Sequence, residues 1–172
     1  MTENENHPTR QANIKLIVTS GIIGLAVGVL LSVISIFLMM PSMMIVTQQC
    51  RLGLDETVSA LEKSIVENGW VISTITDMNK SMAKHGVEFT PRVKLIKLCK
   101  PEYAKSVLET DRHISTIMPC TFSVWQGDDG KTYLSKMNME LMAKMFGGNV
   151  ARVMGGDVAE EEEKMLEGLL KK

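Results

Sequence analysis

Two cysteines of this chain each stand beside a proline at the end of an apolar run. Cys99 closes the stretch VKLIKLC and is followed by Lys100 and Pro101, whereas Cys120 follows Pro119 in the stretch IMPCTF. A thiolate can attack a disulfide, carry a sulfur atom or hold a soft metal. If the two sulfur atoms meet in space, they form a site for redox or ligand chemistry.

The expected surroundings of Cys99 favour its thiolate form. Pro101 suits the first turn of a helix, where its missing N–H is not needed. The free N–H groups and the positive dipole end of such a helix lower the pKa of a nearby thiol. We therefore expect a ligand or redox site at Cys99 and Cys120, surrounded by Pro101, Tyr103, Met118 and Pro119.

Three outcomes stay open for this pair. Free cysteine is among the most buried residue types, so both can be small apolar core residues. A structural or cycling disulfide fits an oxidising compartment. Alternatively, Cys99 and Cys120 act as metal or cofactor ligands for haem, persulfide sulfur or a soft metal such as copper. Cys50 is an odd third thiol, either unpaired or linking two copies of the chain.

Methionine offers further soft ligands, since the chain has 14 methionines. Thioether sulfur together with thiolate suits Cu(I). Met118 stands beside the Met-Pro-Cys turn, and the other candidates are Met137, Met139, Met142, Met145 and Met154. The competing interpretation is core packing, because methionine fills irregular apolar space. The sequence has no CxxC, CxxCH or His-x-x-x-His spacing for zinc or covalent haem.

Charge and motifs argue against several function classes. The 172 residues carry 19 basic and 20 acidic side chains, a formal net charge of −1, so no basic field attracts nucleic acid. The sequence shows no Ser-His-Asp set, phosphate-binding glycine loop or metalloprotease motif. The four glutamates at 160–163 are interpreted as a solvated helix start. Enzymatic activity is therefore not indicated.

An uncharged apolar run from Leu16 to Met40 indicates that the chain is attached to a membrane. About 20 such residues cross the hydrocarbon core of a bilayer, so we expect a single transmembrane helix over 14–41. A cleaved signal peptide is the competing interpretation, although its apolar region has only about 7 to 15 residues. Pro41 is expected to end the helix, and residues 1–13 are expected to form a disordered polar tail.

The flanking charges favour a cytoplasmic N-terminus. Arg10 and Lys15 precede the span, and the next positive charge is Arg51. The C-terminal domain is then periplasmic, on a bacterial inner (plasma) membrane. Within the span, small residues recur every fourth position and form a ridge for helix pairing: Ser20, Gly24, Gly28 and Ser32. We expect the membrane as a partner, a homo-oligomer or larger membrane complex, and no nucleic acid.

The rest of the chain alternates strand and helix patterns. Extended runs are expected at 43–49, 70–76, 93–99, 113–126 and after the Asp-Gly pair at 129–130. Helices are expected from Leu54 to Gly69, from Asp77 to Gly86, from Pro101, over 139–146 and from Ala159. This order predicts an α+β domain over 42–146, with an antiparallel sheet and helices packed on one face. A glycine-punctuated tail with a C-terminal helix follows over 147–172.

Four segments of this domain carry a resemblance to a known family. They are DETVSALEKSIVENGW, TDMNKSMAKHGVEF, KLIKLCKPEYAKSVLETD and IMPCTFSVWQGDDGKTYLSKMN. In order, spacing and turn residues they resemble the domain-of-unknown-function 302 family (DUF 302) over about residues 43–140. The chain looks most like members with a cysteine in both the Cys-x-Pro and Met-Pro-Cys positions. The resemblance implies a TATA-binding-protein-like α+β fold and dimer formation, and it implies no activity.

These observations lead to two functional hypotheses. The first is a single-pass membrane-anchored module that uses Cys99 and Cys120 as a redox, thiol or ligand site in a membrane electron-transfer or sulfur-metabolism complex. The second is an accessory or scaffold subunit of a membrane complex with no chemistry of its own.

Overall fold

The computed structural model describes residues 7–171 and divides the chain into two compact units, residues 1–41 and 42–172. Most of the long helix α1 (His7–Met44) belongs to the first unit, and its last three residues belong to the second. It begins earlier than the expected span over 14–41, so the part of the expected tail from His7 on is helical; residues 1–6 lie outside the described residues. It also continues past Pro41, where we expected it to end, but it stops within one turn of the proline, at Met44.

The apolar part of α1, Leu16–Met40, has a mean hydropathy of 2.8, and none of it is buried inside the chain. Its length and composition are enough to cross a membrane. A signal sequence near an N-terminus meets the same criteria. The core helix of a soluble protein can also meet the criteria of length and composition.

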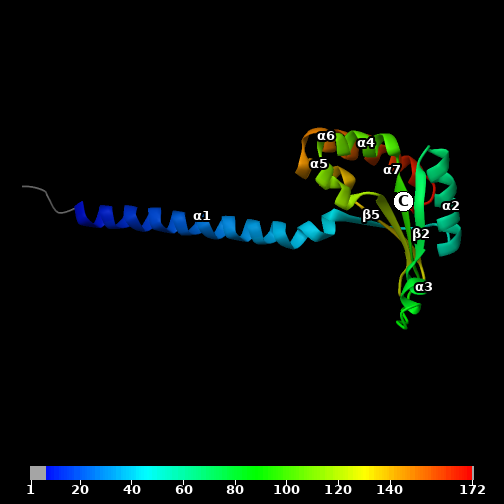
Figure 1. Ribbon diagram of the computed structural model, residues 1–172. Helices are drawn as coiled ribbons and strands as arrows, with labels where there is room; N and C mark the ends of the chain where they lie inside the picture. The colour runs from blue at the N-terminus through cyan, green and yellow to red at the C-terminus, as the bar shows by residue number, and fades with distance from the viewer. Residues whose placement is uncertain (1–6, 172) are drawn as a thin grey trace, which may run out of the picture. The chain divides into compact units, whose positions relative to one another are not determined.

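The second unit is built on a five-stranded antiparallel sheet (Figure 1). Its strand order is β1-β5-β4-β3-β2. The strands are β1 (Ile45–Gln49), β2 (Val71–Asp77), β3 (Val93–Cys99), β4 (Cys120–Gln126) and β5 (Thr132–Met137). The expected α+β class with an antiparallel sheet is confirmed.

Helices connect and cover these strands. In α2 the apolar residues Val58, Leu61 and Ile65 recur at helical spacing and are buried. Asp77 caps α3 by accepting a hydrogen bond from the backbone N–H of Lys80. The helices of this unit are α2 (Leu54–Glu67), α3 (Met78–Ala83), α4 (Pro101–Thr110), α5 (Met139–Phe146), α6 (Gly148–Arg152) and α7 (Ala159–Leu166).

The extended run expected over 113–126 is correct only from Cys120 onward. Its first part forms the 3₁₀ segment η1 (Arg112–Ile117). The β-branched residues there suggested a strand, but Ile114 is buried against the core in a tight turn after α4. Tertiary packing therefore overrides local strand preference.

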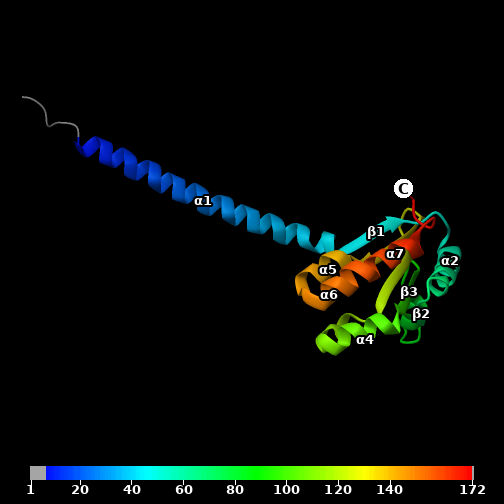
Figure 2. The same cartoon turned by 90° about the horizontal axis from the view of Figure 1, so that it is seen from above.

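Strand alternation gives one face of the sheet to the core. Cys120, Phe122 and Val124 of β4 are buried, whereas the residues between them are only partly buried. Helices α2 and α7 contact each other and lie over the same sheet (Figures 1 and 2). The buried face is therefore the one that α2 and α7 cover.

The segment 147–172, described from the sequence as a tail after the domain, belongs to the same compact unit. The π-helical segment η2 (Val153–Val158) joins α6 to α7 and contributes buried side chains to the core. A Cβ added at Gly155 would lie 2.9 Å from the Cβ of Ala143. This glycine therefore lets η2 approach α5 closely, and it does not mark a loop.

One ion pair links the sheet to α7 inside the core. Lys136 of β5 stands opposite Phe122 on the buried face, and its Nζ lies 2.9 Å from Oε2 of Glu162. Their side chains are only 10% and 2% exposed. Burial raises the pKa of Glu162, and the attraction of Lys136 opposes that rise. Glu162 thus contradicts the interpretation of 160–163 as a solvated helix start.

Removal of Lys136 tests this pair. In Lys136→Ala the Glu162 carboxylate stays buried without compensation, so we expect the free energy of unfolding to fall by about 3–5 kcal/mol. Chemical unfolding of the purified full-length protein measures the loss. Lys144→Ala, which breaks the exposed Lys144–Glu140 pair, is the matched control and should change stability little. Equal small losses in the two variants would contradict the assigned role.

Candidate functional site

A small cavity lies where β3 ends, β4 begins and α4 starts. Its wall contains four sulfur-bearing residues that are distant in sequence: Cys99, Met118, Cys120 and Met154. The remaining wall consists of Trp70, Leu98, Lys100, Tyr103, Ala104, Pro119 and Val158. Its free volume of about 20 Å³ has room for about one water molecule.

The pairing of β3 with β4 brings the cysteines together. Leu98 stands directly opposite Cys120, and Cys99 is the next residue of β3. This register places the two cysteine α-carbons roughly 6 Å apart. Alternation turns Cys120 into the core, whereas Cys99, at the strand end, is only partly buried. Both are free thiols, so the structure contains the expected proximity without a disulfide.

The expected thiolate at Cys99 is contradicted. Burial, followed by the negative charge of Glu102, raises the pKa of Cys99 above its ordinary value. Burial, with smaller contributions from Glu162 and Cys99, raises the pKa of Cys120 to about 12. Desolvation and nearby carboxylates thus outweigh the dipole of α4. Both thiols are protonated at neutral pH.

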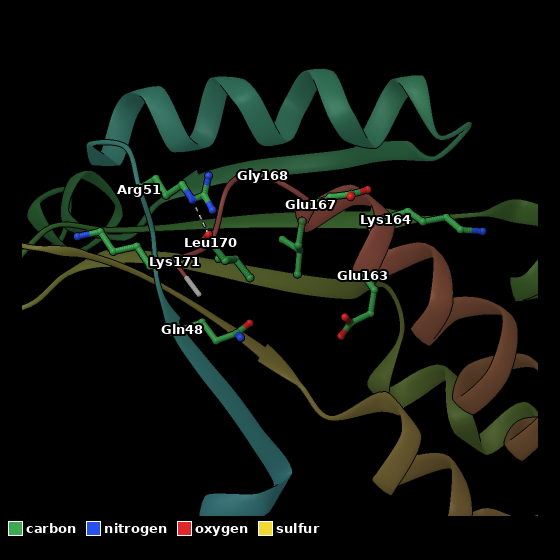
Figure 3. Close-up of a pocket in the computed structure, with 9 residues that line it drawn as sticks. Gln48, Arg51, Glu163, Lys164, Glu167, Gly168, Leu170 and Lys171 are labelled. Atoms are coloured by element: carbon green, nitrogen blue, oxygen red, sulfur yellow. Dashed lines mark hydrogen bonds between the residues drawn. The ribbon is translucent and has the colours of Figure 1, made fainter.

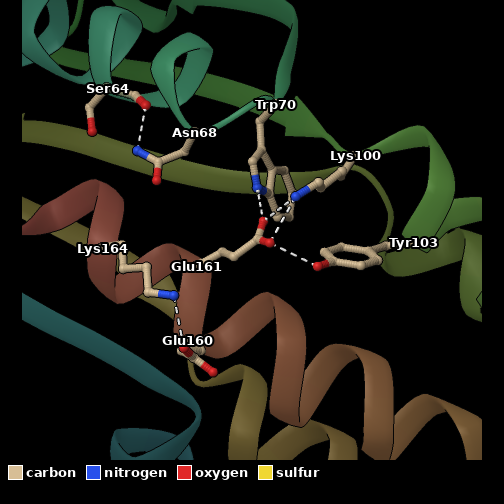
Figure 4. A network of polar contacts seen from close by, with 8 residues as sticks. All are labelled: Ser64, Asn68, Trp70, Lys100, Tyr103, Glu160, Glu161 and Lys164. Carbon is tan, nitrogen blue, oxygen red and sulfur yellow. Dashed lines mark hydrogen bonds and ion pairs between the residues drawn. The ribbon is translucent and has the colours of Figure 1, made fainter.

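A polar cluster joins the cavity wall to α7 (Figure 4). Trp70 Nε1 donates to Oε2 of Glu161 at 2.6 Å, and the Tyr103 hydroxyl donates to Oε1 at 2.8 Å. Lys100 Nζ lies 2.8 and 2.7 Å from the two carboxylate oxygens, and 4.8 Å from the centre of the Tyr103 ring. Burial raises the pKa of Glu161, but these three donors outweigh it and hold the pKa below its ordinary value.

The expected residues around the cysteines are only partly brought together. Tyr103, Met118 and Pro119 line the cavity, and the Met118–Pro119 peptide bond is cis. Pro101 begins α4 as expected but is exposed and does not line the cavity. Ser20, Gly24, Gly28 and Ser32 belong to the separate N-terminal unit.

Sequence reasoning missed the polar half of the site. Trp70 and Lys100 reach the cavity because β2 and β3 are neighbours, and Glu161 reaches them from the far end of the chain. Only the change from apolar to charged residues at Lys100 hinted at this cluster. The pairing of Glu161 with Trp70 spans 91 positions and leaves no local pattern.

The donor set limits what the cavity can hold. Within residues 7–171, no group of three or more His, Cys, Asp or Glu side chains could hold a metal ion. A site here would need the methionine thioethers. Haem does not fit, because pockets for ligands of that size enclose hundreds of Å³. The cluster around α5 does not serve as a thioether site, since Met139 and Met142 are core residues and Met145 is exposed.

Two larger hollows lie away from the cysteines. One of about 440 Å³ is lined by side chains of both charges, including Arg51, Glu163, Lys164 and Lys171 (Figure 3). Arg51 Nε donates to the carbonyl of Leu170 there. The other, of about 450 Å³, lies beside β1 and Gly156. Their mixed charges define no single ligand class, so the sulfur-lined cavity is the better candidate.

Comparisons with known proteins agree with this architecture. The family model described as "Domain of unknown function DUF302" matches residues 44–172. A crystal structure of an uncharacterized conserved protein DUF302 from Bacillus stearothermophilus aligns with a TM-score of 0.65 at 20% identity. The alignment covers 73% of this chain and 97% of the other, and at this identity it supports the fold alone. Among curated proteins, none matches the sequence.

The raised pKa of Cys120 predicts a loss of stability at alkaline pH. The thiol of the unfolded chain ionises from about pH 9, whereas folded Cys120 keeps its proton to about pH 12. Stability is therefore lost as pH rises above 9, by up to about 1.4 kcal/mol per pH unit. We expect Cys120→Ala to lose less stability than the wild type when pH is raised from 8 to about 10.5. Parallel pH profiles from chemical unfolding would contradict the burial of this thiol.

Proposed function

Because this chain belongs to the DUF302 family, whose description assigns no activity, we propose from its own residues that it is a membrane-anchored module that binds one thiophilic ligand. One Cu(I) ion is the ligand that suits the cavity. The observation that carries the proposal is the convergence of Cys99, Met118, Cys120 and Met154 on one small cavity.

The chemistry of the wall supports Cu(I) over other ligands. Thiolate and thioether sulfur are soft donors, which favour Cu(I) over Mg²⁺ or Ca²⁺. The free volume of about 20 Å³ suits a single ion. Cu(I) carries one positive charge, which compensates one of the two thiolate charges that coordination by Cys99 and Cys120 creates. This balance matters because an uncompensated buried charge is costly.

Protonated thiols make ligand binding depend on pH. A thiol must lose its proton to coordinate a metal, so binding releases protons and affinity rises with pH. The same protonation makes the cysteines poor nucleophiles, which favours ligand binding over rapid thiol cycling.

A second candidate is an accessory or scaffold subunit without chemistry. The burial of Cys120 and the raised pKa of both cysteines favour it, because inert cysteines have these properties. It predicts no metal uptake at this cavity.

Placement at a membrane is part of the proposal. The exposed apolar segment of α1 would act as a single-pass anchor in a bacterial inner membrane, with the α+β domain in the periplasm. The Cys-x-Pro and Met-Pro-Cys motifs support the finer placement among members with both cysteines and in a TATA-binding-protein-like fold. Partners would be a second copy or a larger electron-transfer or sulfur-metabolism complex.

Metal titration tests the proposed ligand. We expect the reduced full-length protein to bind one Cu(I) per chain in competition with a chromophoric chelator. Cys99→Ser and Cys120→Ser should each weaken binding by about tenfold or more, because the site has few donors. Proton release on binding, measured in weakly buffered solution, should approach two per ion, because each of the two coordinating cysteines loses its thiol proton.

Cys50→Ala is the matched control, because Cys50 is a buried free thiol outside the cavity wall. It should leave Cu(I) affinity unchanged. If the wild type takes up no Cu(I), or if all three cysteine variants bind Cu(I) as the wild type does, the cavity is not a copper site. The accessory or scaffold function is then the remaining candidate.

Helix pairing by α1 is tested separately. The Cβ positions of Gly24 and Gly28 meet no atom within 4 Å, so the ridge is uncovered within the chain. We expect Gly24→Ile and Gly28→Ile to reduce the oligomer size in detergent, since bulky side chains prevent close helix contact. Ala26→Ile, on the opposite face of the helix from the ridge, is the control and should not. Unchanged size in the ridge variants, by light scattering, would exclude the ridge as a packing face.

A further inference from the structure

One carboxylate holds three side chains of the cavity wall. Trp70, Lys100 and Tyr103 all line the cavity, and all three bond to Glu161. Glu161 itself is not part of the wall. It therefore acts from behind the wall, and Figure 4 shows the three side chains converging on it.

The three donors come from two separate parts of the fold. Trp70 directly precedes β2, whereas Lys100 and Tyr103 stand at the start of α4. Glu161 lies in the first turn of α7. The preceding segment η2 supplies Met154 and Val158 to the same wall. Glu161 thus joins the helical run that carries Met154 to two of the other segments that form the cavity wall.

The cavity is too small to exchange a hydrated or carrier-bound ligand without movement of its wall. Its free volume of about 20 Å³ admits no ion together with its hydration shell or a donor molecule. Bonds from donors to a carboxylate are charge-assisted and are stronger than neutral hydrogen bonds. A wall held by one such carboxylate opens when that carboxylate releases its donors.

We propose that Glu161 is the positioning residue that closes the sulfur-lined cavity and sets the rate at which a thiophilic ligand enters and leaves. This role rests on the proposed function as far as the ligand is concerned. The closing of the wall over Cys120 is a property of the ligand-free protein and is measurable without any metal.

The chain contains a matched control on the same helix. Glu160 precedes Glu161 but is exposed and pairs with Lys164 at 2.8 Å on the other side of α7 (Figure 4). Glu160→Gln therefore changes the charge of α7 without touching the wall. Glu161→Ala removes the bonds to all three donors. Glu161→Gln keeps one acceptor oxygen, which serves either Trp70 or Tyr103, and loses the charge that holds Lys100.

Cys120 labelling measures opening in the ligand-free protein. In full-length protein carrying Cys50→Ala and Cys99→Ser, Cys120 is the single cysteine. We expect N-ethylmaleimide to label it about tenfold faster after Glu161→Ala, because strong polar bonds to a charged group are lost. Glu161→Gln should give an intermediate rate, and Glu160→Gln should leave the rate unchanged.

Cu(I) release measures the same opening in the loaded protein with all three native cysteines. After Glu161→Ala, transfer to an excess of chelator should be about tenfold faster, whereas equilibrium affinity should change less than about threefold, because all sulfur donors remain. This separation of rate from affinity is what a merely structural role of Glu161 would not produce.

The outcomes separate the two proposals. Faster labelling in Glu161→Ala without any Cu(I) uptake by the wild type supports the closing role and refutes the copper site. If both Glu161 variants are labelled at the same rate as the protein that carries only Cys50→Ala and Cys99→Ser, the closing role is overturned. This holds whatever the result of the Cu(I) measurements. Equal acceleration by Glu160→Gln also overturns it, since the effect would then come from general loosening of α7. If Glu161→Ala does not fold, the labelling rate of Cys120 in Glu161→Gln alone decides whether Glu161 closes the cavity.

Discussion

Everything at the candidate site depends on the antiparallel pairing of β3 with β4. The register that sets Leu98 opposite Cys120 also places Cys99, the start of α4 and the Met-Pro-Cys turn at one end of the sheet. A shift of one residue would turn Phe122 and Val124 out of the core. The hydrophobic core therefore enforces the register, and the register in turn enforces the proximity of the two cysteines.

Burial, more than local charge, determines the chemistry of those cysteines. The start of α4 should favour a thiolate at Cys99, but desolvation and Glu102 act in the opposite direction and are stronger. At Cys120 the same effect is larger, because that side chain lies in the core. The result is a pair of neutral thiols beside two thioethers. Such a wall is inert toward nucleophilic chemistry and suited to a soft ion that replaces the thiol protons.

Three successive glutamates of α7 show how helical rotation separates roles. Glu160 is exposed and pairs along the helix, Glu161 holds the cavity wall, and Glu162 is buried against Lys136. A residue step of a helix turns about 100°, so neighbours face solvent, the rim and the sheet in turn. The sequence predicts one solvated acidic stretch here. In the structure, Glu161 of that stretch holds the cavity wall and Glu162 takes part in the core.

The sequence alone determined the strands, most helices, the α+β class and the apolar span, because hydrophobic periodicity and turn residues are local signals. It also indicated that Cys99 and Cys120 end apolar runs. Only the tertiary structure decided that 113–117 is helical, that η2 supplies Met154 to the cavity, that Glu161 joins Trp70 and Lys100, and that both thiols stay protonated. These features depend on which distant residues share a buried volume, and desolvation is a property of that volume and leaves no local pattern in the chain.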